Sequence, residues 1–171
     1  MVLTLRLRFA VLLLTSFGAP AVAHSPVTRS PAATRLAPAL RQPAAVVDAF
    51  HLALRQGRTA DALALLADDA LILESGSIEA GKAAYAAQHL AADAEFAAAT
   101  TSQTYRRSGA AAGTIAWLAS EGRTRGIFNG KAIDQHTTET MVLRRDADGW
   151  RIAHVHWSSR KTPAPISGLV K

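Results

Sequence analysis

The sequence predicts an α+β fold in which helices pack on one face of a curved antiparallel sheet. Apolar residues recur at helical spacing in the first half of the chain, up to about residue 91. After Asp93 the pattern changes to long segments of strand type, separated by the turn sequences Asn129-Gly130 and Asp148-Gly149. Because the helices come first and the hairpins follow one another, we expect one layer of helices and one sheet.

The helices are predicted from apolar spacing and from the residues that begin and end them. Pro43 suits the first turn of a helix and Gly57 suits a helix end, so the apolar residues between them are expected to form one helix. Thr59 is a suitable N-cap for a second, leucine-rich helix. A third helix places Tyr85 and His89 one turn apart on the same side. The predicted helices cover residues 44–56, about 59–69 and about 79–91.

The strands are predicted as apolar or alternating segments bounded by turns. They cover residues 71–74, 100–107, 114–128, 131–145 and 150–159. The sequence contains no internal repeat, no glycine-rich phosphate loop and no nucleophile elbow. The chemistry of nucleotide binding and of serine hydrolases is therefore not indicated.

The N-terminus has the three parts of a secretory signal peptide. Arg6 and Arg8 form a positive region, residues 9–17 form a short apolar run, and residues 21–23 (Ala-Val-Ala) supply the small residues of a cleavage site. The apolar run is far shorter than the roughly 20 residues that span a bilayer, so no stable membrane anchor is expected. We predict cleavage near Ala23 and export, so that the protein is periplasmic or secreted.

The rest of the chain is expected to form a single domain between two loose ends. Proline recurs in the segment that follows the signal peptide and in the C-terminal segment, which favours a linker and a tail. The chain has no cysteine, so its stability must come from its own core. The predicted parts are a signal peptide (1–23), a Pro-rich linker (24–43), a folded domain (44–159) and a flexible basic tail (160–171).

The distribution of charge argues against a nucleic-acid partner. The formal net charge is +6, with 19 Lys and Arg against 13 Asp and Glu. Five of the basic residues precede Ala44 and three follow Ser159, whereas all the acidic residues lie between these two positions. A nucleic-acid-binding domain carries its basic surplus on its folded surface. We therefore expect no nucleic acid among the partners.

Residues 149–158 (Gly-Trp-Arg-Ile-Ala-His-Val-His-Trp-Ser) form the most informative segment. They read as one strand with two histidines and two tryptophans. Strict alternation places one set of side chains on one face of the strand and the other set on the opposite face. The first set is Ile152, His154, His156 and Ser158, and the second is Ala153, Val155 and Trp157.

Together these segments resemble the nuclear-transport-factor-2-like superfamily, in particular its SnoaL-like and ketosteroid-isomerase-like small exported members. The resemblance rests on residues 44–57, the leucine-rich second helix, and residues 71–74, 139–145 and 149–158. It covers about residues 44–159. It implies a cone-shaped antiparallel sheet wrapped around the N-terminal helices (a cystatin-like, ketosteroid-isomerase-like roll), with a pocket between sheet and helices. Homodimers formed through the sheet are common in such families, so a homodimer is expected.

The resemblance implies no single activity, because this fold hosts enzymes, binding modules and oligomerisation domains. Isomerases of this kind use a carboxylate base with a tyrosine and an acid opposite. The only tyrosines, Tyr85 and Tyr105, lie outside the first helix, where the resemblance would place one. Isomerase chemistry is therefore not implied.

His156 and Glu139 are the candidate catalytic residues. An imidazole titrates near neutral pH and suits a general base, and a carboxylate on the neighbouring strand could orient it. His154 or Tyr85 would then donate a hydrogen bond to a developing oxyanion. Alternatively, the histidines contact backbone or a carboxylate and only hold the strand in place.

Seven further residues are candidates for contact with a ligand. They are aromatic or titratable and are expected near the cone or its mouth: Glu74, Tyr85, His89, Trp117, Glu121, His154 and Trp157. The alternative is that the tryptophans are core, that Glu74, Glu121 and His89 are solvated, and that Tyr85 packs its helix. A metal would need a third ligand, such as His89 or Glu139, beside the two histidines, so no metal site and no cofactor are predicted.

Three functions remain open at this point. The first is an exported domain that binds a small, mostly apolar molecule in the cone. The second is an acid–base enzyme, of isomerase, dehydratase or hydrolase type, on a small apolar carbonyl substrate. The third is a dimerisation or assembly module without a ligand.

Overall fold

A computed structural model describes residues 36–163 of the chain. The predicted signal peptide, most of the predicted linker and the end of the tail lie outside these residues. The helices are η1 (Pro38–Leu40), α1 (Arg41–Arg55), α2 (Thr59–Ala64), α3 (Lys82–Gln88) and α4 (Leu90–Ala99). The strands are β1 (Leu66–Glu74), β2 (Ser77–Ala80), β3 (Thr100–Ala112), β4 (Ile115–Phe128), β5 (Lys131–Asp146) and β6 (Gly149–Lys161).

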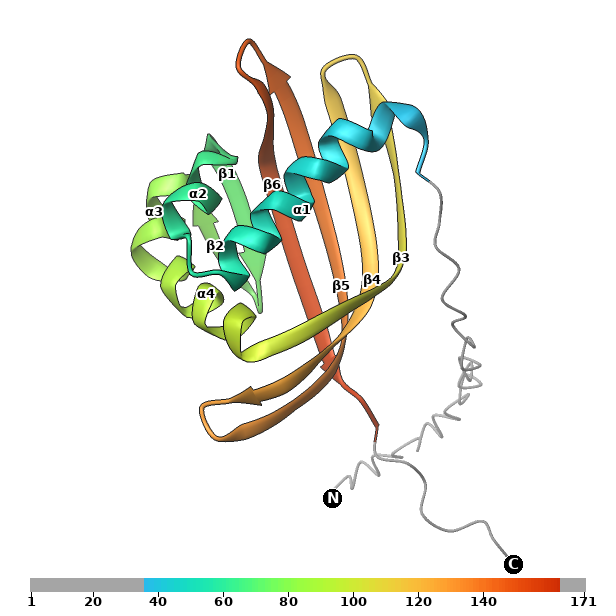
Figure 1. Ribbon diagram of the computed structural model, residues 1–171. Helices are drawn as coiled ribbons and strands as arrows, with labels where there is room; N and C mark the ends of the chain where they lie inside the picture. The colour runs from blue at the N-terminus through green and yellow to red at the C-terminus, as the bar shows by residue number, and fades with distance from the viewer. Residues whose placement is uncertain (1–35, 164–171) are drawn as a thin grey trace, which may run out of the picture.

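The six strands form one sheet in the order β2-β1-β6-β5-β4-β3. The sheet is strongly curved, and α1 crosses its concave face, while α2, α3 and α4 gather with β2 at one end (Figure 1). The α+β class with a curved sheet under the N-terminal helices is thereby confirmed. One pair of neighbours, β1 and β6, is parallel, an addition to the antiparallel pairing predicted from the hairpins.

Two predicted helices have different bounds in the structure. The second ends at Ala64 rather than near residue 69, because the apolar side chains from Leu66 onward are buried by strand pairing with β6. The third, predicted as one helix over residues 79–91, is a strand end followed by two helices. Gly81, with φ +101°, separates β2 from α3, and His89 separates α3 from α4.

The core lies between α1 and the middle of the sheet. Val47 and Phe50 on α1 are fully buried, as are Met141 and Leu143 on β5 and Ile152 on β6. On α1 the buried residues recur at spacings of three and four, as expected for a helix with one apolar face. Helix and sheet are therefore held together by this apolar contact, and the long strands continue beyond it (Figure 1).

A β-bulge in β6 decides which side chains face α1. Leu143 pairs with Ile152 and the next residue back, Val142, pairs with His154, so Ala153 is an extra residue in the strand. Bulges of this kind locally disrupt the alternation of side chains. Ile152 and Val155 are both buried although they are three positions apart. We define the inner face of the sheet as the concave face toward α1, and the outer face as the opposite one.

The β4–β5 hairpin extends past α1 and curls beneath α4 (Figure 1). The bend requires glycine at position 126, because a Cβ there would lie 2.5 Å from the carbonyl oxygen of Ala99. Phe128 near the hairpin tip meets Phe96 of α4 edge to face, with ring centroids 5.3 Å apart. The hairpin thus reaches the end of α4, where the sheet is no longer covered by α1.

Candidate functional site

A cavity of about 350 Å³ lies between α1, α4 and the inner face of β3 to β6. Nearly half of the residues that line it are Ser, Thr or Gln, and most of the others are charged. Ser102 on β3 and Thr124 on β4 share a hydrogen bond of 2.8 Å across its floor. A cavity of this composition suits a ligand rich in hydrogen-bonding groups rather than the mostly apolar molecule expected from the sequence.

Five lining residues form a straight row across the sheet, one from each of five strands. The register pairs Glu74 with Trp157, Trp157 with Glu139, Glu139 with Ser120, and Ser120 with Arg107. Residues paired in register point to the same face of a sheet, and all five line the cavity. We call this set the polar row. It is acidic at the β1 end and basic at the β3 end.

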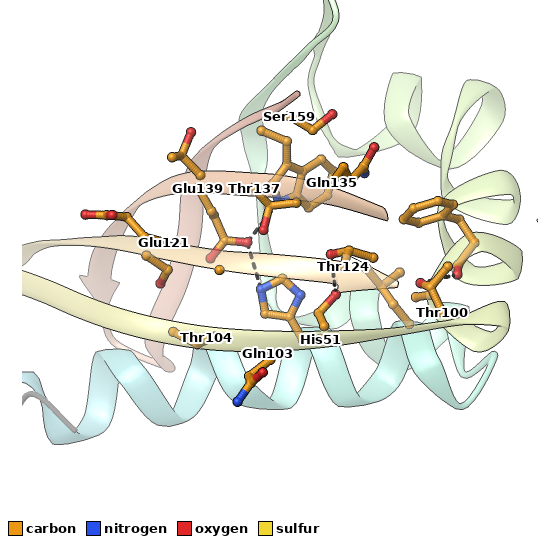
Figure 2. A pocket seen from close by; sticks show the side chains of 18 of the residues that line it. His51, Thr100, Gln103, Thr104, Glu121, Thr124, Gln135, Thr137, Glu139 and Ser159 are labelled. Carbon is orange, nitrogen blue, oxygen red and sulfur yellow. Dashed lines mark hydrogen bonds and ion pairs between the residues drawn. The ribbon is translucent and has the colours of Figure 1, made fainter. Parts of the chain in front are cut away.

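Glu139 lies at the centre of the polar row and is held by two donors. His51 Nε2 on α1 and Trp157 Nε1 on β6 each lie 2.8 Å from the same oxygen, Glu139 Oε2 (Figure 2). A carboxylate only accepts hydrogen bonds, so both nitrogens donate. The other oxygen, Oε1, has no partner among residues 36–163. The carboxylate is therefore fixed by one oxygen and presents the other to the cavity.

The ionised form of Glu139 is favoured although the side chain is only 12% exposed. Burial alone would raise the pKa of Glu139, but the charge of His51, the hydrogen bonds from His51 and Trp157 and the charge of Arg107 together lower it. Phe50 stacks behind the indole of Trp157, with centroids 6.3 Å apart, and fixes that donor in place. The site therefore holds a mostly buried carboxylate whose ionised form is favoured and whose position is set by two donors.

Arg107 forms the second bridge between the sheet and α1. Its Nη1 donates to Asp48 Oδ1 at 2.7 Å, and its Nε donates to Ser120 Oγ at 3.1 Å. Asp48 and His51 are three residues apart on α1, so they lie on the same side of the helix. Two polar contacts, one turn apart, thus attach α1 to the rim of the cavity.

The β1 end of the cavity has a different electrostatic character. Tyr85, fully buried, donates a hydrogen bond of 2.8 Å to Asp93 Oδ2. Burial raises the pKa of Asp93, and burial together with the charge of Asp93 raises the pKa of Glu74. Burial and the neighbouring Asp93 also raise the pKa of the Tyr85 hydroxyl. The pKa values of Glu74 and Asp93 are thus shifted upward, toward the neutral form, whereas the pKa of Glu139 is shifted downward.

Four of the predicted site residues line the cavity: Glu74, Glu121, Glu139 and Trp157. Of these, Glu121 carries its side chain on the outer face, where Arg106 pairs with it. Tyr85 does not line the cavity and acts through Asp93. His89 pairs with the buried Glu79 between α3 and α4, away from the cavity. Trp117 is 43% exposed on the outer face.

The predicted pairing of His156 with Glu139 is not made, and this is a correction. His156 is paired with Thr140, the neighbour of Glu139, and both point to the outer face. The bulge at Ala153 is the reason, because the inward direction of Ile152 is not continued to His154 and His156. His154 is half-buried on the outer face, where burial and the adjacent His156 lower its pKa. His156 is exposed and so is not available as a base in the cavity.

The histidine that contacts Glu139, His51, was not predicted from the sequence, and neither were Asp48 and Arg107. A signal for His51 was present, since it lies four residues after Val47 and three before Leu54, on the apolar face of the first helix. A histidine in an otherwise apolar stripe indicates a polar partner opposite. Nothing in the spacing identifies Arg107, because its role depends on a strand register that the sequence does not encode locally.

The described part of the chain contains no cluster of three His, Asp or Glu side chains able to hold a metal ion. His154 and His156 lie on the outer face, whereas Glu139, one of the two third ligands considered for a metal, lies on the inner face and does not converge with them. The other, His89, pairs with Glu79 instead. Between residues 36 and 163, no helix combines the length and the apolar character needed to cross a membrane.

Comparison with protein families and solved structures places this geometry among known folds. The SnoaL-like domain family matches residues 44–162. A candidate ketosteroid isomerase from Shewanella frigidimarina is 35% identical in sequence, and the match covers 72% of this chain and 100% of that chain with a TM-score of 0.68. No curated protein matches the chain.

Two more distant structures share the fold alone. An NTF2-like protein with a cystatin-like fold from Novosphingobium aromaticivorans is 14% identical, with a TM-score of 0.59 over 70% of this chain and 80% of that one. The CaMKII hub of S. rosetta is 18% identical, with a TM-score of 0.62 over 72% of this chain and 98% of that one. The cystatin-like roll predicted from the sequence is thereby confirmed.

Proposed function

Because this chain belongs to the SnoaL-like domain family of the NTF2-like superfamily, we propose that it binds a small polar molecule in the inner cavity, with Glu139 as the central acceptor. The observation that carries the proposal is the two-donor contact on Glu139 Oε2, which leaves Oε1 open to the cavity. Burying an ionised carboxylate is costly, and a purely structural role would use both of its oxygens. An oxygen that faces a cavity is available to a ligand.

A thermal-shift screen against a library of small metabolites tests this proposal. Compounds that bind should raise the melting temperature of the wild type and should lose this effect in Glu139→Gln, since the amide presents a different donor and acceptor pattern. Glu95→Gln is the matched control, because Glu95 is exposed on α4 outside the cavity. If no compound stabilises the wild type, or if both variants respond as the wild type does, the proposal is refuted.

A second candidate, an acid–base enzyme, is favoured by the contact between His51 and Glu139. When Nε2 of a histidine donates to a carboxylate, the neutral ring keeps the lone pair of Nδ1 for proton transfer, and the carboxylate balances the charge that develops. His51 lines the cavity, so a bound molecule could reach its ring. Glu139 itself is a weak base because its pKa is lowered. His51 is therefore the base and Glu139 the positioning residue in this scheme.

The enzyme candidate is tested on any compound that the screen identifies. Turnover should be abolished in His51→Gln, whereas binding of the same compound should fall much less. Loss of turnover in His156→Gln to the same extent would contradict the assignment, because His156 is on the outer face.

We also infer that the outer face joins two copies of the chain. Ile115 and Trp117 are 45% and 43% exposed next to each other on β4, and Leu71 on β1 is 43% exposed. Large apolar side chains grouped on one face favour an interface. Light scattering should give the mass of a dimer, and Trp117→Glu should give that of a monomer. A monomeric wild type would exclude this interface.

Export to the periplasm or the medium remains our inference from the N-terminal sequence. Fractionation of cells that produce the full chain, with mass spectrometry of the product, tests it. The expected mature N-terminus is His24, directly after the Ala-Val-Ala segment. An unprocessed protein found with the cytoplasmic fraction would contradict it.

A further inference from the structure

Arg107 has a donor that the contacts with α1 do not use. Its Nη1 and Nε are taken by Asp48 and Ser120, and Nη2 has no partner within the described range 36–163. Arg107 lines the cavity and is only 18% exposed at its side chain. The guanidinium is therefore held in a fixed orientation with one donor group free, as Glu139 is held with one acceptor free.

The two free groups lie in the same row of the sheet. Arg107 and Glu139 are both paired in register with Ser120, which lies between them on β4. Two strand spacings separate their backbones, about 10 Å, and both side chains rise from the same face. The charge of Arg107 is felt at Glu139, where it helps to lower the pKa of the carboxyl. A molecule that fits the cavity can reach both groups at once.

The pair selects for a particular ligand chemistry. A guanidinium N–H donates to a carbonyl oxygen, and a carboxylate oxygen accepts from a hydroxyl group. An anionic ligand is disfavoured because Glu139 is ionised and Glu74 and Asp93 line the same cavity. We propose that the cavity recognises neutral hydroxy-carbonyl compounds, with the carbonyl oxygen on Arg107 Nη2 and the hydroxyl group on Glu139 Oε1.

This inference rests on the proposed function and makes Arg107 a residue that determines specificity. The rival explanation is that Arg107 only attaches α1 to the sheet through Asp48. The two explanations differ for Asp48→Asn, which removes the ionic contact but leaves the guanidinium in the cavity. Under our inference this variant keeps its ligand preference, and under the rival it behaves like Arg107→Gln.

Three aromatic probes of similar size separate the two contacts. Mandelamide carries a hydroxyl and a carbonyl group, phenylacetamide keeps only the carbonyl group, and 1-phenylethanol keeps only the hydroxyl group. Their dissociation constants are measured by NMR titration of the purified chain. The wild type should bind mandelamide about tenfold more tightly than either of the other probes, since one charge-assisted hydrogen bond is lost in each case.

The Arg107 and Glu139 variants should weaken the binding of different probes. Arg107→Gln should weaken mandelamide and phenylacetamide about tenfold and leave 1-phenylethanol unchanged. Glu139→Gln should weaken mandelamide and 1-phenylethanol and leave phenylacetamide unchanged. Asp48→Asn should stay within about twofold of the wild type for all three, less than the loss of one hydrogen bond. If Arg107→Gln does not fold, Arg107→Lys takes its place, because lysine keeps the positive charge. The same loss of affinity is then expected for mandelamide and phenylacetamide.

Several results would overturn the inference. Equal weakening by Arg107→Gln and Asp48→Asn, or equal weakening of all three probes by Arg107→Gln, would show that Arg107 only holds α1. Absence of mandelamide binding in a protein that binds other library compounds would refute the ligand class but leave the proposed function standing. Absence of binding by every compound would refute both.

Discussion

The inner and outer faces of β5 and β6 are built from alternating residues of the same two strands, yet their environments differ completely. On the inner face, Glu139 and Trp157 form a hydrogen bond beneath α1. On the outer face, their immediate neighbours Thr140 and His156 are paired with each other, without a helix above them (Figure 1). The difference shows that alternation along each strand, together with the bulge at Ala153 in β6, decides which side chains face the cavity.

Insertion of one alanine between Val155 and His156 is the most direct way to break this comparison. The added residue reverses the alternation of side chains beyond it, so that Trp157 leaves the inner face and His156 takes its place. Loss of the packing of the indole and of its hydrogen bond to Glu139 should lower the free energy of unfolding by about 3 kcal/mol or more, measured by urea unfolding. Deletion of Ala153 is the control and should cost less, because it removes the bulge but leaves the inward side chains on the inner face in regular alternation. Equal losses in the two variants would contradict the assigned faces of the strand.

A matched pair of valine substitutions sharpens the comparison. Val155 is fully buried on the inner face, whereas Val142 is only half-buried on the outer face. Val155→Ala should cost about 2 kcal/mol of unfolding free energy, from lost burial and the space left behind. Val142→Ala should cost less than about 1 kcal/mol in the monomer, because less apolar area is lost. A larger cost for Val142, with loss of the dimer in light scattering, would place it in the subunit interface instead.

The two ends of the cavity should respond to pH with opposite sign. Glu139 has a pKa below its ordinary value of 4.5, so its ionised form stabilises the fold above that pH, and this contribution is lost as the pH falls through the lowered pKa. Glu139→Gln should cost about 1.5 kcal/mol at pH 7 and progressively less on acidification below the ordinary pKa. Glu74 has a raised pKa, so its charge opposes folding at neutral pH.

Glu74→Gln should therefore leave stability unchanged or raise it by up to about 1 kcal/mol at pH 7, and this gain should disappear below the ordinary carboxyl pKa. Unfolding free energies of the wild type and both variants between pH 7 and acidic pH provide the measurement. A cost at neutral pH for Glu74→Gln similar to that of Glu139→Gln would show that the two ends are alike.

The smallest effect is expected on the outer face. His156→Gln should change the unfolding free energy by about 0.5 kcal/mol or less, since the side chain is exposed and forms no hydrogen bond or ion pair within residues 36–163. Binding of any compound found in the screen should be unaffected. Weakened binding in this variant would show that the ligand binds at the outer face, against our proposal.

The parts of the molecule that were predicted correctly depend on local patterns. The first helix, the long hairpin at Asn129-Gly130 and the face shared by Glu139 and Met141 all follow from residue spacing and turn residues. The failures depend on what spacing does not encode. The bulge at Ala153 shifts the alternation of side chains in β6 after Ile152, so that the histidines face outward. The histidine that contacts Glu139 comes from a helix about ninety residues away in sequence. The register that aligns Arg107 with Glu139 likewise arises only when three strands pair.

The polar row takes one residue from each of five strands, and only Trp157 among them packs against the buried core, where it stacks on Phe50 of α1. Substitution of Glu74, Ser120 or Arg107 therefore changes the lining of the cavity, while the apolar packing between α1 and β5 is left in place. Such a scaffold can diversify by single steps, each acting on a different part of the bound molecule. Libraries that vary Glu74, Ser120 and Arg107 together are therefore a practical starting point for redirecting the cavity to new compounds.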